Sequence, residues 1–411
     1  MSHGFFRGFF LFIRLLIMTV FTEQDKIFMR QAIVLAEKGR GRTSPNPMVG
    51  AVIVRDGKVI STGYHRKAGT DHAEVDAIKN SSIPVKGSDI YVSLEPCSIQ
   101  GRTPPCTDAL IQNGFKRVII GAVDPNPAVD GNGIRKLKDA GIEVLSGLFS
   151  EEIAVQNEVF FKNMKRKLPF ICAKIASSID GKLATKTSDS KWITSIQSRK
   201  VVQEMRLEYG CVLTGINTIM ADDPTLFPKT DPGGTIKDNL RSFLAGEHMN
   251  YARIILDTDL RIPLDSNIVK TAGDISTIIF TSDKPMGKTG TNKKVEKLQD
   301  SKVSLEFLPG IRPDSGEVLR ILYDKYGIVS VMLEAGPAIL TSFLKGQLIN
   351  KFTIFMAPKI IGGDSPYNMF SKLENNLISD STDLEFSSFK KLGSDLMITA
   401  YPINNNKQNE R

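Results

Sequence analysis

Apolar runs rich in β-branched residues alternate with amphipathic segments in the first half of the chain. Two strand-like runs flank Asp56-Gly57 within residues 48–65, which is the signature of a two-residue hairpin. Further strands are expected at 90–94, 117–123 and 143–145, and helices at 25–38, 72–80, 107–114 and 134–140. Strands that alternate with helices predict an α/β fold in which helices cover the faces of a sheet.

A second series of alternating elements begins at Phe170, after a basic stretch at 162–169 that reads as a linker. Strands are expected at 170–178, 211–215, 253–257, 277–280, 303–308 and 329–336, and helices at 195–208, 293–300, 315–325 and 337–345. Residues 228–250 are polar and rich in glycine, which predicts a loop. Strands at 351–357, 385–391 and 395–401 then suggest a closing β-meander. The pattern therefore predicts two α/β domains, at 22–165 and 169–403.

The two ends of the chain differ from the rest. Residues 1–21 form an apolar extension, but its core at 4–18 is too short to span a bilayer and contains Arg7 and Arg14. Two interpretations stay open, an interfacial anchor or a translation start at Met18, and neither predicts stable membrane insertion. Thr22 and Asp25 form a capping-box pattern at the first helix. The polar tail 404–411 is expected to be disordered.

Composition narrows the class of protein. The chain has 411 residues, 41% of them hydrophobic and 24% charged, which is typical of globular domains. The net charge of +8 is dispersed, so it suits anionic small molecules better than nucleic acid. Of the four cysteines, Cys172 and Cys211 lie in strand-like runs and are expected to be buried thiols. This cysteine usage fits a reducing cytoplasm.

Two short stretches contain the residues of a zinc-dependent deaminase. HAEVDAI at 72–78 supplies His72 and Glu74, and LEPCSIQGRTPPC at 94–106 supplies Cys97 and Cys106. Zinc binds thiolates and neutral imidazole, and the His-x-Glu and Pro-Cys pattern assigns the Glu to proton transfer rather than to the metal. The alternative is an ordinary buried His with two core cysteines, but four residues in this order argue against it.

Polar residues gather at predicted strand ends in the second half. The strand-turn-helix at Glu334-Ala335-Gly336-Pro337 could hold a phosphate at the helix start, although most such turns are only connections. No G-x-G-x-x-G fingerprint supports a Rossmann site. Candidate contacts with substrate or coenzyme, each of which could instead be a cap, a turn residue or an ion pair, are Lys174, Asp180, Trp192, Arg206, Asp222 and Asp223.

The order of the motifs resembles a known family. Ser44-Pro45-Asn46-Pro47, GYHRKAGTDHAE, LEPCSIQGRTPPC, DPNP at 124–127, SSIDGKLA, KWITS, ADDP and EAGP together resemble the bifunctional riboflavin-biosynthesis deaminase–reductases, from about residue 22 to 401. The nine-residue Cys–Cys spacing is itself characteristic of that family. The resemblance implies a cytidine-deaminase-like three-layer domain that binds one zinc ion. It also implies a dihydrofolate-reductase-like domain that uses NADPH.

The same resemblance implies the reactions and the residues. The first domain would deaminate a phosphoribosylated diaminopyrimidine with Glu74 as proton carrier, and the second would reduce the ribose to a ribityl chain. Implied coenzyme contacts are Ala176, Trp192, Thr218, Asp222, Thr258 and the helix start Gly336, Pro337, Ala338, Ile339, Leu340, Thr341 and Ser342. Implied substrate contacts are Asn46, Lys174, Ser190, Arg206, Leu226, Lys229 and Glu334. The partners expected are phosphorylated pyrimidines and further copies of the chain, without nucleic acid.

Some points stay open from sequence. Lys174, Asp222 or Glu334 could supply the proton that accompanies hydride transfer. Ile99-Gln100 stand where the family has a His. Lys229 stands where the family has an Arg that is expected to grip the substrate phosphate, so a charge is kept but a bidentate fork is lost. Rival interpretations are a deaminase with a non-catalytic second domain and a zinc-stabilised nucleic-acid-binding module.

Overall fold

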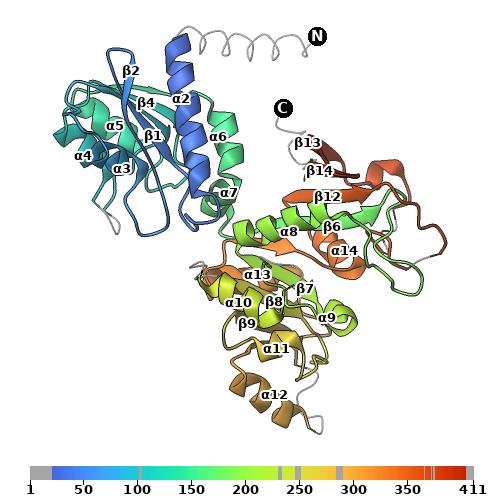
Figure 1. The fold of residues 1–411 in the computed structure, drawn as a ribbon. Coiled ribbons are helices and arrows are strands. Elements are labelled where there is room, and N and C mark those ends of the chain that lie inside the picture. The colour runs from blue at the N-terminus through green and yellow to red at the C-terminus, as the bar shows by residue number, and fades with distance from the viewer. Residues whose placement is uncertain are drawn as a thin grey trace. The chain divides into compact units, whose positions relative to one another are not determined.

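Figure 1 shows the computed structural model, which describes residues 21–100, 104–229, 234–245, 251–283, 290–364, 366–371, 373 and 375–403. The chain divides into two compact units at Lys167 and Leu168. The predicted apolar extension up to residue 20 and the predicted tail at 404–411 lie outside the described residues. Among the described residues, no helix is both long and apolar enough to cross a membrane.

The first unit opens with helix α2 (Glu23–Ala36), followed by a 3-10 turn η1 (Glu37–Gly39). The predicted capping box is confirmed. The Asp25 amide donates to the Thr22 hydroxyl at 3.1 Å, and the Thr22 amide donates to the Asp25 carboxylate at 2.8 Å. These bonds satisfy amides that the first helical turn leaves unpaired, so the helix begins where the sequence indicates.

A five-stranded sheet forms the centre of this unit. Its order is β2-β1-β3-β4-β5, built from β1 (Gly50–Arg55), β2 (Lys58–Tyr64), β3 (Asp89–Leu94), β4 (Arg117–Ala122) and β5 (Glu143–Ser146). The predicted hairpin is confirmed, because β1 and β2 pair antiparallel around Asp56 and Gly57, with φ of 50° and 71°. Strands β3, β4 and β5 run parallel, so their carboxyl ends share one edge of the sheet.

Helices cover both faces of this sheet (Figure 1). Ala51 and Ile53 point to the core beneath α3 (Ala73–Lys79), α4 (Cys106–Gln112) and α5 (Asn132–Asp139). Their neighbours Val52 and Val54 point to the core beneath α2 and α6 (Ser150–Gln156). Because successive side chains of a strand face opposite ways, an unbroken apolar run requires a layer on each side. The unit is a three-layer α/β/α sandwich.

The stretch 162–169 was predicted as a linker, and that prediction is wrong for most of it. Helix α7 (Glu158–Arg166) extends through it and ends at Lys167, which adopts a left-handed backbone. Phe160 and Phe161 pack against the core beneath α2, which accounts for the helix better than the basic residues that follow them. Lys165 and Arg166 are exposed in the last turn, where their charges favour the helix dipole, whereas Lys162 is half-buried.

The second unit is built on a nine-stranded sheet with the order β10-β9-β8-β7-β11-β6-β12-β14-β13. The strands from β10 to β12 in this order are parallel to their neighbours. The strand bounds are β6 (Phe170–Ser178), β7 (Cys211–Gly215), β8 (Ala252–Leu256), β9 (Ser276–Ser282), β10 (Ser304–Leu308), β11 (Ser330–Leu333), β12 (Lys351–Ala357), β13 (Leu384–Leu392) and β14 (Asp395–Pro402).

Helices connect these strands. They are α8 (Ile196–Tyr209), α9 (Ile216–Asp222), α10 (Ile236–Ala245), α11 (Asn267–Lys270), α12 (Thr291–Asp300), α13 (Ser315–Asp324), α14 (Pro337–Lys345) and the 3-10 turn η2 (Ile378–Asp380). Helix α10 corrects the prediction of a loop over 228–250. Phe243 is buried against Phe227 and Tyr251. This apolar contact stabilises α10, although the polar composition of the segment had predicted a loop.

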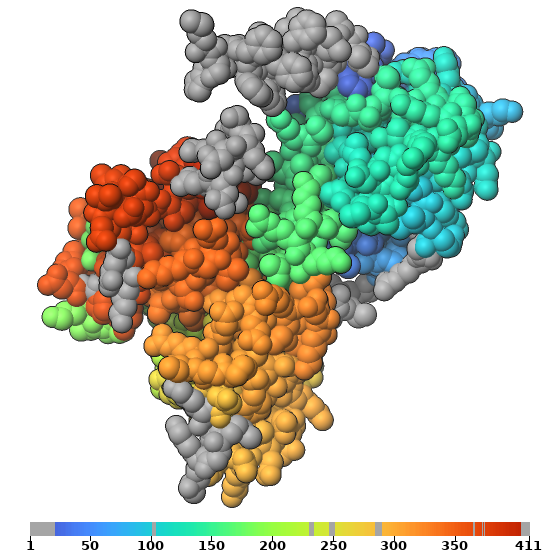
Figure 2. Space-filling view, turned by 180° about the vertical axis from the view of Figure 1, so that it is seen from behind, coloured from blue at the N-terminus to red at the C-terminus, as the bar shows by residue number. Residues whose placement is uncertain are grey.

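The end of the sheet also differs from expectation. All three closing strands form, but β14 lies between β12 and β13, so the predicted β-meander order is wrong. Strand β13 is therefore the sheet edge, and Phe386 and Phe389 on it are exposed. Figure 2 shows this C-terminal segment in red at one side of the second unit, with the orange residues around 300 at another.

Candidate active sites

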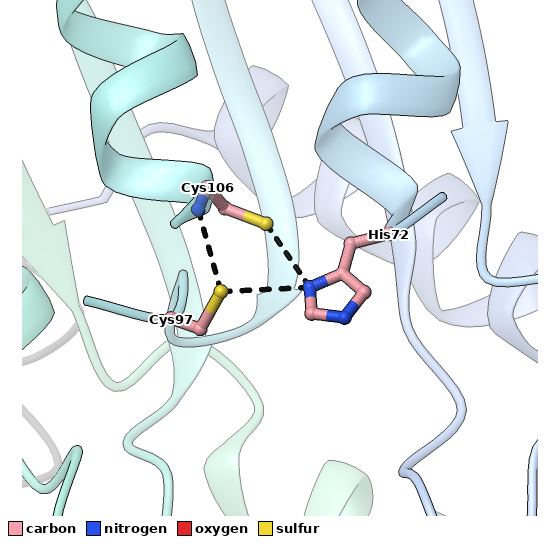
Figure 3. Close-up of side chains that lie close together, drawn as sticks. All are labelled: His72, Cys97 and Cys106. Carbon is pink, nitrogen blue, oxygen red and sulfur yellow. Dashed lines mark hydrogen bonds between the residues drawn. The ribbon is translucent and has the colours of Figure 1, made fainter. Parts of the chain in front are cut away.

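Three loops of the first unit bring His72, Cys97 and Cys106 together (Figure 3). His72 is the N-cap of α3, Cys97 follows β3 after Glu95-Pro96, and Cys106 is the first residue of α4. The predicted positions at helix starts are therefore confirmed for His72 and Cys106. Cys97 follows the end of β3, and His72 and Cys106 stand at the starts of α3 and α4, so the fold brings the three side chains together.

The three ligand atoms have the spacing that a tetrahedral zinc ion needs. His72 Nδ1 lies 3.1 Å from Cys106 Sγ and 3.5 Å from Cys97 Sγ, and all three ligand atoms fall within 4.8 Å. Zinc bonds of about 2.0–2.3 Å place tetrahedral ligand atoms roughly 3.5 Å apart. Hydrogen bonds from Cys106 and His72 lower the pKa of the Cys97 thiol to about 4, which favours the thiolate that metals bind. The donor set fits zinc.

Glu74 lies beside this cluster without belonging to it. It is 3% exposed, and burial raises the pKa of its carboxyl to about 7. A cavity of about 400 Å³ adjoins both groups, and Asn46 and Ile99 contribute to its walls. Asn46 Nδ2 lies 3.2 Å from Nε2 of His65, whose Nδ1 lies 3.0 Å from the Asp71 carbonyl oxygen. The cavity thus has a polar wall for a heterocycle and an adjacent proton carrier.

Sequence reasoning gave no role to His65, Asp124, Asn126 or Phe160, which also line the cavity. Asp124 is 7% exposed, and burial raises the pKa of its carboxyl to about 6. The sequence did contain a signal for these residues. The DPNP motif at 124–127 follows β4 just as the LEPC motif follows β3, and the two strands are parallel neighbours. Residues after adjacent parallel strands meet at one edge of the sheet.

A second cluster forms in the other unit around Glu334, which follows β11. Arg206 of α8 grips both carboxylate oxygens, with Nε at 2.6 Å and Nη2 at 3.1 Å, and Lys174 Nζ of β6 lies 3.1 Å away. Burial opposes ionisation of Glu334, but the charges of Arg206 and Lys174 outweigh it and hold the pKa at about 2. The structure therefore joins three of the expected substrate contacts into one ionised group.

Other expected contacts lie at the same carboxyl edge of the parallel strands. Ala176 shares the face of Lys174 on β6, two residues apart. Thr218 lies on α9 after β7, and the carbonyl of Thr258 after β8 accepts the Ser282 amide at 3.1 Å. Ligands of open parallel sheets bind at this edge.

Trp192 and Asp222 lie among exposed polar partners. The Trp192 ring is 63% exposed and covered by the Arg199 guanidinium at 4.3 Å, so it is not a core residue. Asp222 pairs with Lys191 at 3.3 Å. Ser190 is half-buried in the same segment.

Helix α14 begins at Pro337, its N-cap is Gly336, and no side chain caps it. Its first amides are therefore available to an anion. Farther along the expected run, Leu340 packs in the core, Thr341 accepts the Ser371 amide at 2.9 Å, and Ser342 Oγ lies 3.1 Å from Ser315 Oγ. The helix start and the residues nearest to it, rather than these three side chains, are placed to meet a ligand.

Leu226 and Lys229 belong to the loop after α9. Leu226 is buried with a φ of 54°, and the Lys229 amide donates to Gln203 Oε1 at 2.9 Å. Asp223 is tied to Asn267 through backbone and side-chain bonds, so it acts as a turn residue. Asp180 holds the amides of Ile361 and Gly362, which gives it a local structural partner as well.

Known proteins match both halves. Residues 22–122 match the cytidine and deoxycytidylate deaminase zinc-binding region, and residues 169–398 match the RibD C-terminal domain. Riboflavin biosynthesis protein RibD of Aquifex aeolicus is 41% identical over 92% of this chain and 98% of its own length. The Escherichia coli protein of the same name is 34% identical over 91% of this chain and 98% of its own.

Solved structures agree. Acinetobacter baumannii RibD has a TM-score of 0.78 at 33% identity, covering 93% of this chain and 99% of that one. A Thermotoga maritima diaminohydroxyphosphoribosylaminopyrimidine deaminase/5-amino-6-(5-phosphoribosylamino)uracil reductase has a TM-score of 0.76 at 32% identity, covering 92% and 99%. The predicted fold class is confirmed in both halves. The chain belongs to the RibD family of bifunctional riboflavin-biosynthesis enzymes.

Proposed function

We propose that the first unit deaminates 2,5-diamino-6-hydroxy-4-(5-phosphoribosylamino)pyrimidine, and that the second unit reduces the ribosyl chain with NADPH to give 5-amino-6-(5-phosphoribitylamino)uracil. The observation that carries the first step is the convergence of His72, Cys97 and Cys106 beside the buried carboxyl of Glu74, on the wall of a 400 Å³ cavity. A zinc site with a structural role alone has no need of that carboxyl.

In the deaminase step, His72, Cys97 and Cys106 would hold zinc, which when bound lowers the pKa of its water toward neutrality. Water adds to the ring carbon that carries the amino group, and the C–N bond then breaks. Glu74 takes a proton from this water at its carboxylate and passes it to the amino group, which leaves as ammonia. Asn46 presents its amide to the heterocycle, and its contact with His65 keeps that amide oriented. Ile99 places an apolar surface at the cavity, where relatives are expected to have a His, so fewer polar contacts to substrate come from this loop.

In the reductase step, we assign the proton donor to Lys174. Glu334 is ionised at neutral pH because its pKa is held at about 2, so it has no proton to give. Asp222 is engaged by Lys191. The Lys174 ammonium carries protons, and Glu334 fixes its position at 3.1 Å. Purified enzyme given the deaminated intermediate should oxidise NADPH, and Lys174→Met should lose this activity while ammonia release stays unchanged. Undiminished NADPH oxidation by Lys174→Met would refute the assignment.

We attribute the preference for NADPH over NADH to a basic groove at the carboxyl edge of the sheet. The groove is shallow and open to solvent, has a volume of about 490 Å³, and is lined by Arg261, Lys293, Lys294 and Lys297. Arg261 donates to Asn217, next to Thr218, at 2.7 Å, and Lys294 donates to the Leu260 carbonyl at 2.7 Å. The groove therefore adjoins both expected coenzyme loops. We place the 2′-phosphate of NADPH here, because several cations around one cavity favour a dianion.

The double variant Lys293→Ala/Lys297→Ala tests this placement. The KM for NADPH should rise at least tenfold, while the KM for NADH, which lacks the 2′-phosphate, should stay the same. Lys270→Ala, a charge removed from the end of the short helix α11, is the matched control and should change neither value. Equal increases for both coenzymes would show that the groove does not read the 2′-phosphate.

We also propose a homo-oligomer in the cytoplasm. Phe386 and Phe389 lie 5.2 Å apart on edge strand β13 and are 58% and 60% exposed, which is costly for a strand left unpaired. None of the four cysteines, all of which lie in the described residues, forms a disulfide, as suits a reducing compartment. Light scattering should report more than one chain per particle for the natural protein, and Phe386→Lys/Phe389→Lys should lower that number. A monomeric natural protein would contradict the proposal.

A further inference from the structure

Three consecutive carbonyls of the loop after α9 are each held by a different large side chain. The Thr225 carbonyl accepts from Arg253 Nη1 at 3.0 Å, and the Leu226 carbonyl accepts from Tyr251 Oη at 2.6 Å. The Phe227 carbonyl accepts from Arg206 Nη1 at 3.5 Å. Loops on a protein surface usually leave such groups to water, so this loop is fixed from the core outward.

The loop needs that support because its backbone is strained. Leu226 has a φ of 54°, in the left-handed region that is unfavourable for a residue with a side chain. Its side chain is only 3% exposed. A conformation of this kind persists where surrounding contacts determine it, and such sites cluster where ligands bind. Two residues of this loop, Leu226 and Lys229, are among the substrate contacts that the family resemblance implies.

Arg253 is the largest fully buried side chain of the described residues, with no exposed surface. It makes six hydrogen bonds, with Thr225, Ile268 and Ile275 carbonyls and with the hydroxyls of Thr271 and Thr277. No carboxylate among the described residues forms an ion pair with it. A buried guanidinium without a counter-ion is costly, and an apolar residue would fill the same volume at less cost. What Arg253 provides that an apolar residue could not is a set of hydrogen bonds that hold the Thr225 carbonyl in a fixed position relative to β9 and α11.

Tyr251 makes the second attachment from the same strand region. Its ring packs edge-on against Phe243 with centroids 5.3 Å apart, and its hydroxyl points at Leu226. Burial raises the pKa of this hydroxyl well above its ordinary value, so it remains a donor throughout the working pH range. Arg206 makes the third attachment to the loop. Because Arg206 also binds Glu334, it links the loop to the carboxylate that positions Lys174, the proposed proton donor.

We propose that Arg253 and Tyr251 are positioning residues of the reductase, which set the Thr225–Phe227 backbone and thereby place Leu226 and Lys229 against the phosphorylated chain of the substrate. The proposal rests on the proposed reductase function, with Leu226 and Lys229 as the substrate contacts that the family resemblance implies. It predicts an effect on binding of the pyrimidine rather than of NADPH, because the basic groove and the start of α14 are built from other loops.

Tyr251→Phe is the primary test, because it removes the hydroxyl and retains the ring that packs on Phe243. Reductase kinetics are measured with the deaminated intermediate and NADPH on the full chain. The KM for the intermediate should rise about fivefold, which corresponds to about 1 kcal/mol, while the KM for NADPH, kcat and ammonia release by the first unit stay unchanged. Arg253→Lys, which keeps the charge but loses the fork, should show the same division with a larger rise.

Tyr326→Phe is the matched control. Its half-buried hydroxyl bonds Glu306 on β10, which is not part of the loop, so its loss should leave both KM values unchanged. Unaltered kinetics in Tyr251→Phe, a fall in kcat at constant KM, or an equal rise in both KM values would each overturn the positioning role. Failure of the natural enzyme to oxidise NADPH with the intermediate would instead overturn the proposed function itself.

Discussion

Replacing Glu334 with glutamine removes the anion that Arg206 and Lys174 share. The carboxyl is enclosed, and its pKa of about 2 lies some 2.5 units below the ordinary value of 4.5. At about 1.4 kcal/mol per unit, the ionised form gains roughly 3 kcal/mol in the folded state. Glutamine keeps the shape and loses this gain, and it also leaves two cations without a counter-charge. We expect the melting temperature of the second unit to fall by about 6–12 °C at pH 7.

Differential scanning calorimetry on the full chain measures this shift. Because the pKa is lowered on folding, the contribution is present above about pH 4.5 and is lost as the pH falls toward 2. The difference between natural protein and Glu334→Gln should therefore shrink below pH 4.5. Glu296→Gln, at an exposed position on α12, is the control and should change little. Equal melting temperatures for Glu334→Gln and natural protein at pH 7 would refute the electrostatic account.

Three further results are expected. Glu74→Gln should retain zinc and lose at least 100-fold in ammonia release, since the proton carrier is gone, and full ammonia release would rule out its role. Zinc removal by a chelator should abolish ammonia release and spare NADPH oxidation of the deaminated intermediate, with recovery on adding zinc; loss of both activities would contradict two independent sites. Lys229→Arg should lower the reductase KM for the phosphorylated intermediate, because a guanidinium fork binds phosphate through two bonds; a higher KM would count against phosphate contact at this position.

Local patterns predicted most of the elements because the forces that form them are local. Three local patterns each predict a structure without help from distant residues, and each structure occurs as expected. They are the Thr22–Asp25 capping box, the Asp56-Gly57 turn and the apolar run of β6. The failures have distant causes. Helix α10 depends on Phe243 meeting Phe227 and Tyr251, and no periodicity in residues 228–250 discloses that contact.

Strand order is another property that local pattern does not carry. The three closing strands were found in sequence, but β14 sits between β12 and β13 because its pairing to β12 is a long-range choice. A β-meander and the observed order β12-β14-β13 have the same alternation of apolar and polar residues along each strand, so the sequence pattern does not distinguish them.

The zinc cluster was predictable because its residues stand in two short sequence motifs, at the start of α3 and between β3 and the start of α4. Family resemblance supplied the remaining candidate residues, including Arg206 and Glu334. It could not show that Glu334 is held ionised by Arg206 and Lys174, which removes it from the three candidate proton donors. Arg253 went unnoticed, since a single Arg in an apolar strand looks like an end residue until its burial is known.

The central claim is that one chain performs both steps through two separate sites. Zinc-loaded protein is given the diaminopyrimidine phosphoribosyl substrate and NADPH, and ammonia release and NADPH absorbance are followed in the same cuvette. About one NADPH should be oxidised per ammonia released, with ammonia appearing first. Ammonia release with no loss of NADPH, or NADPH oxidation without ammonia, would contradict this claim.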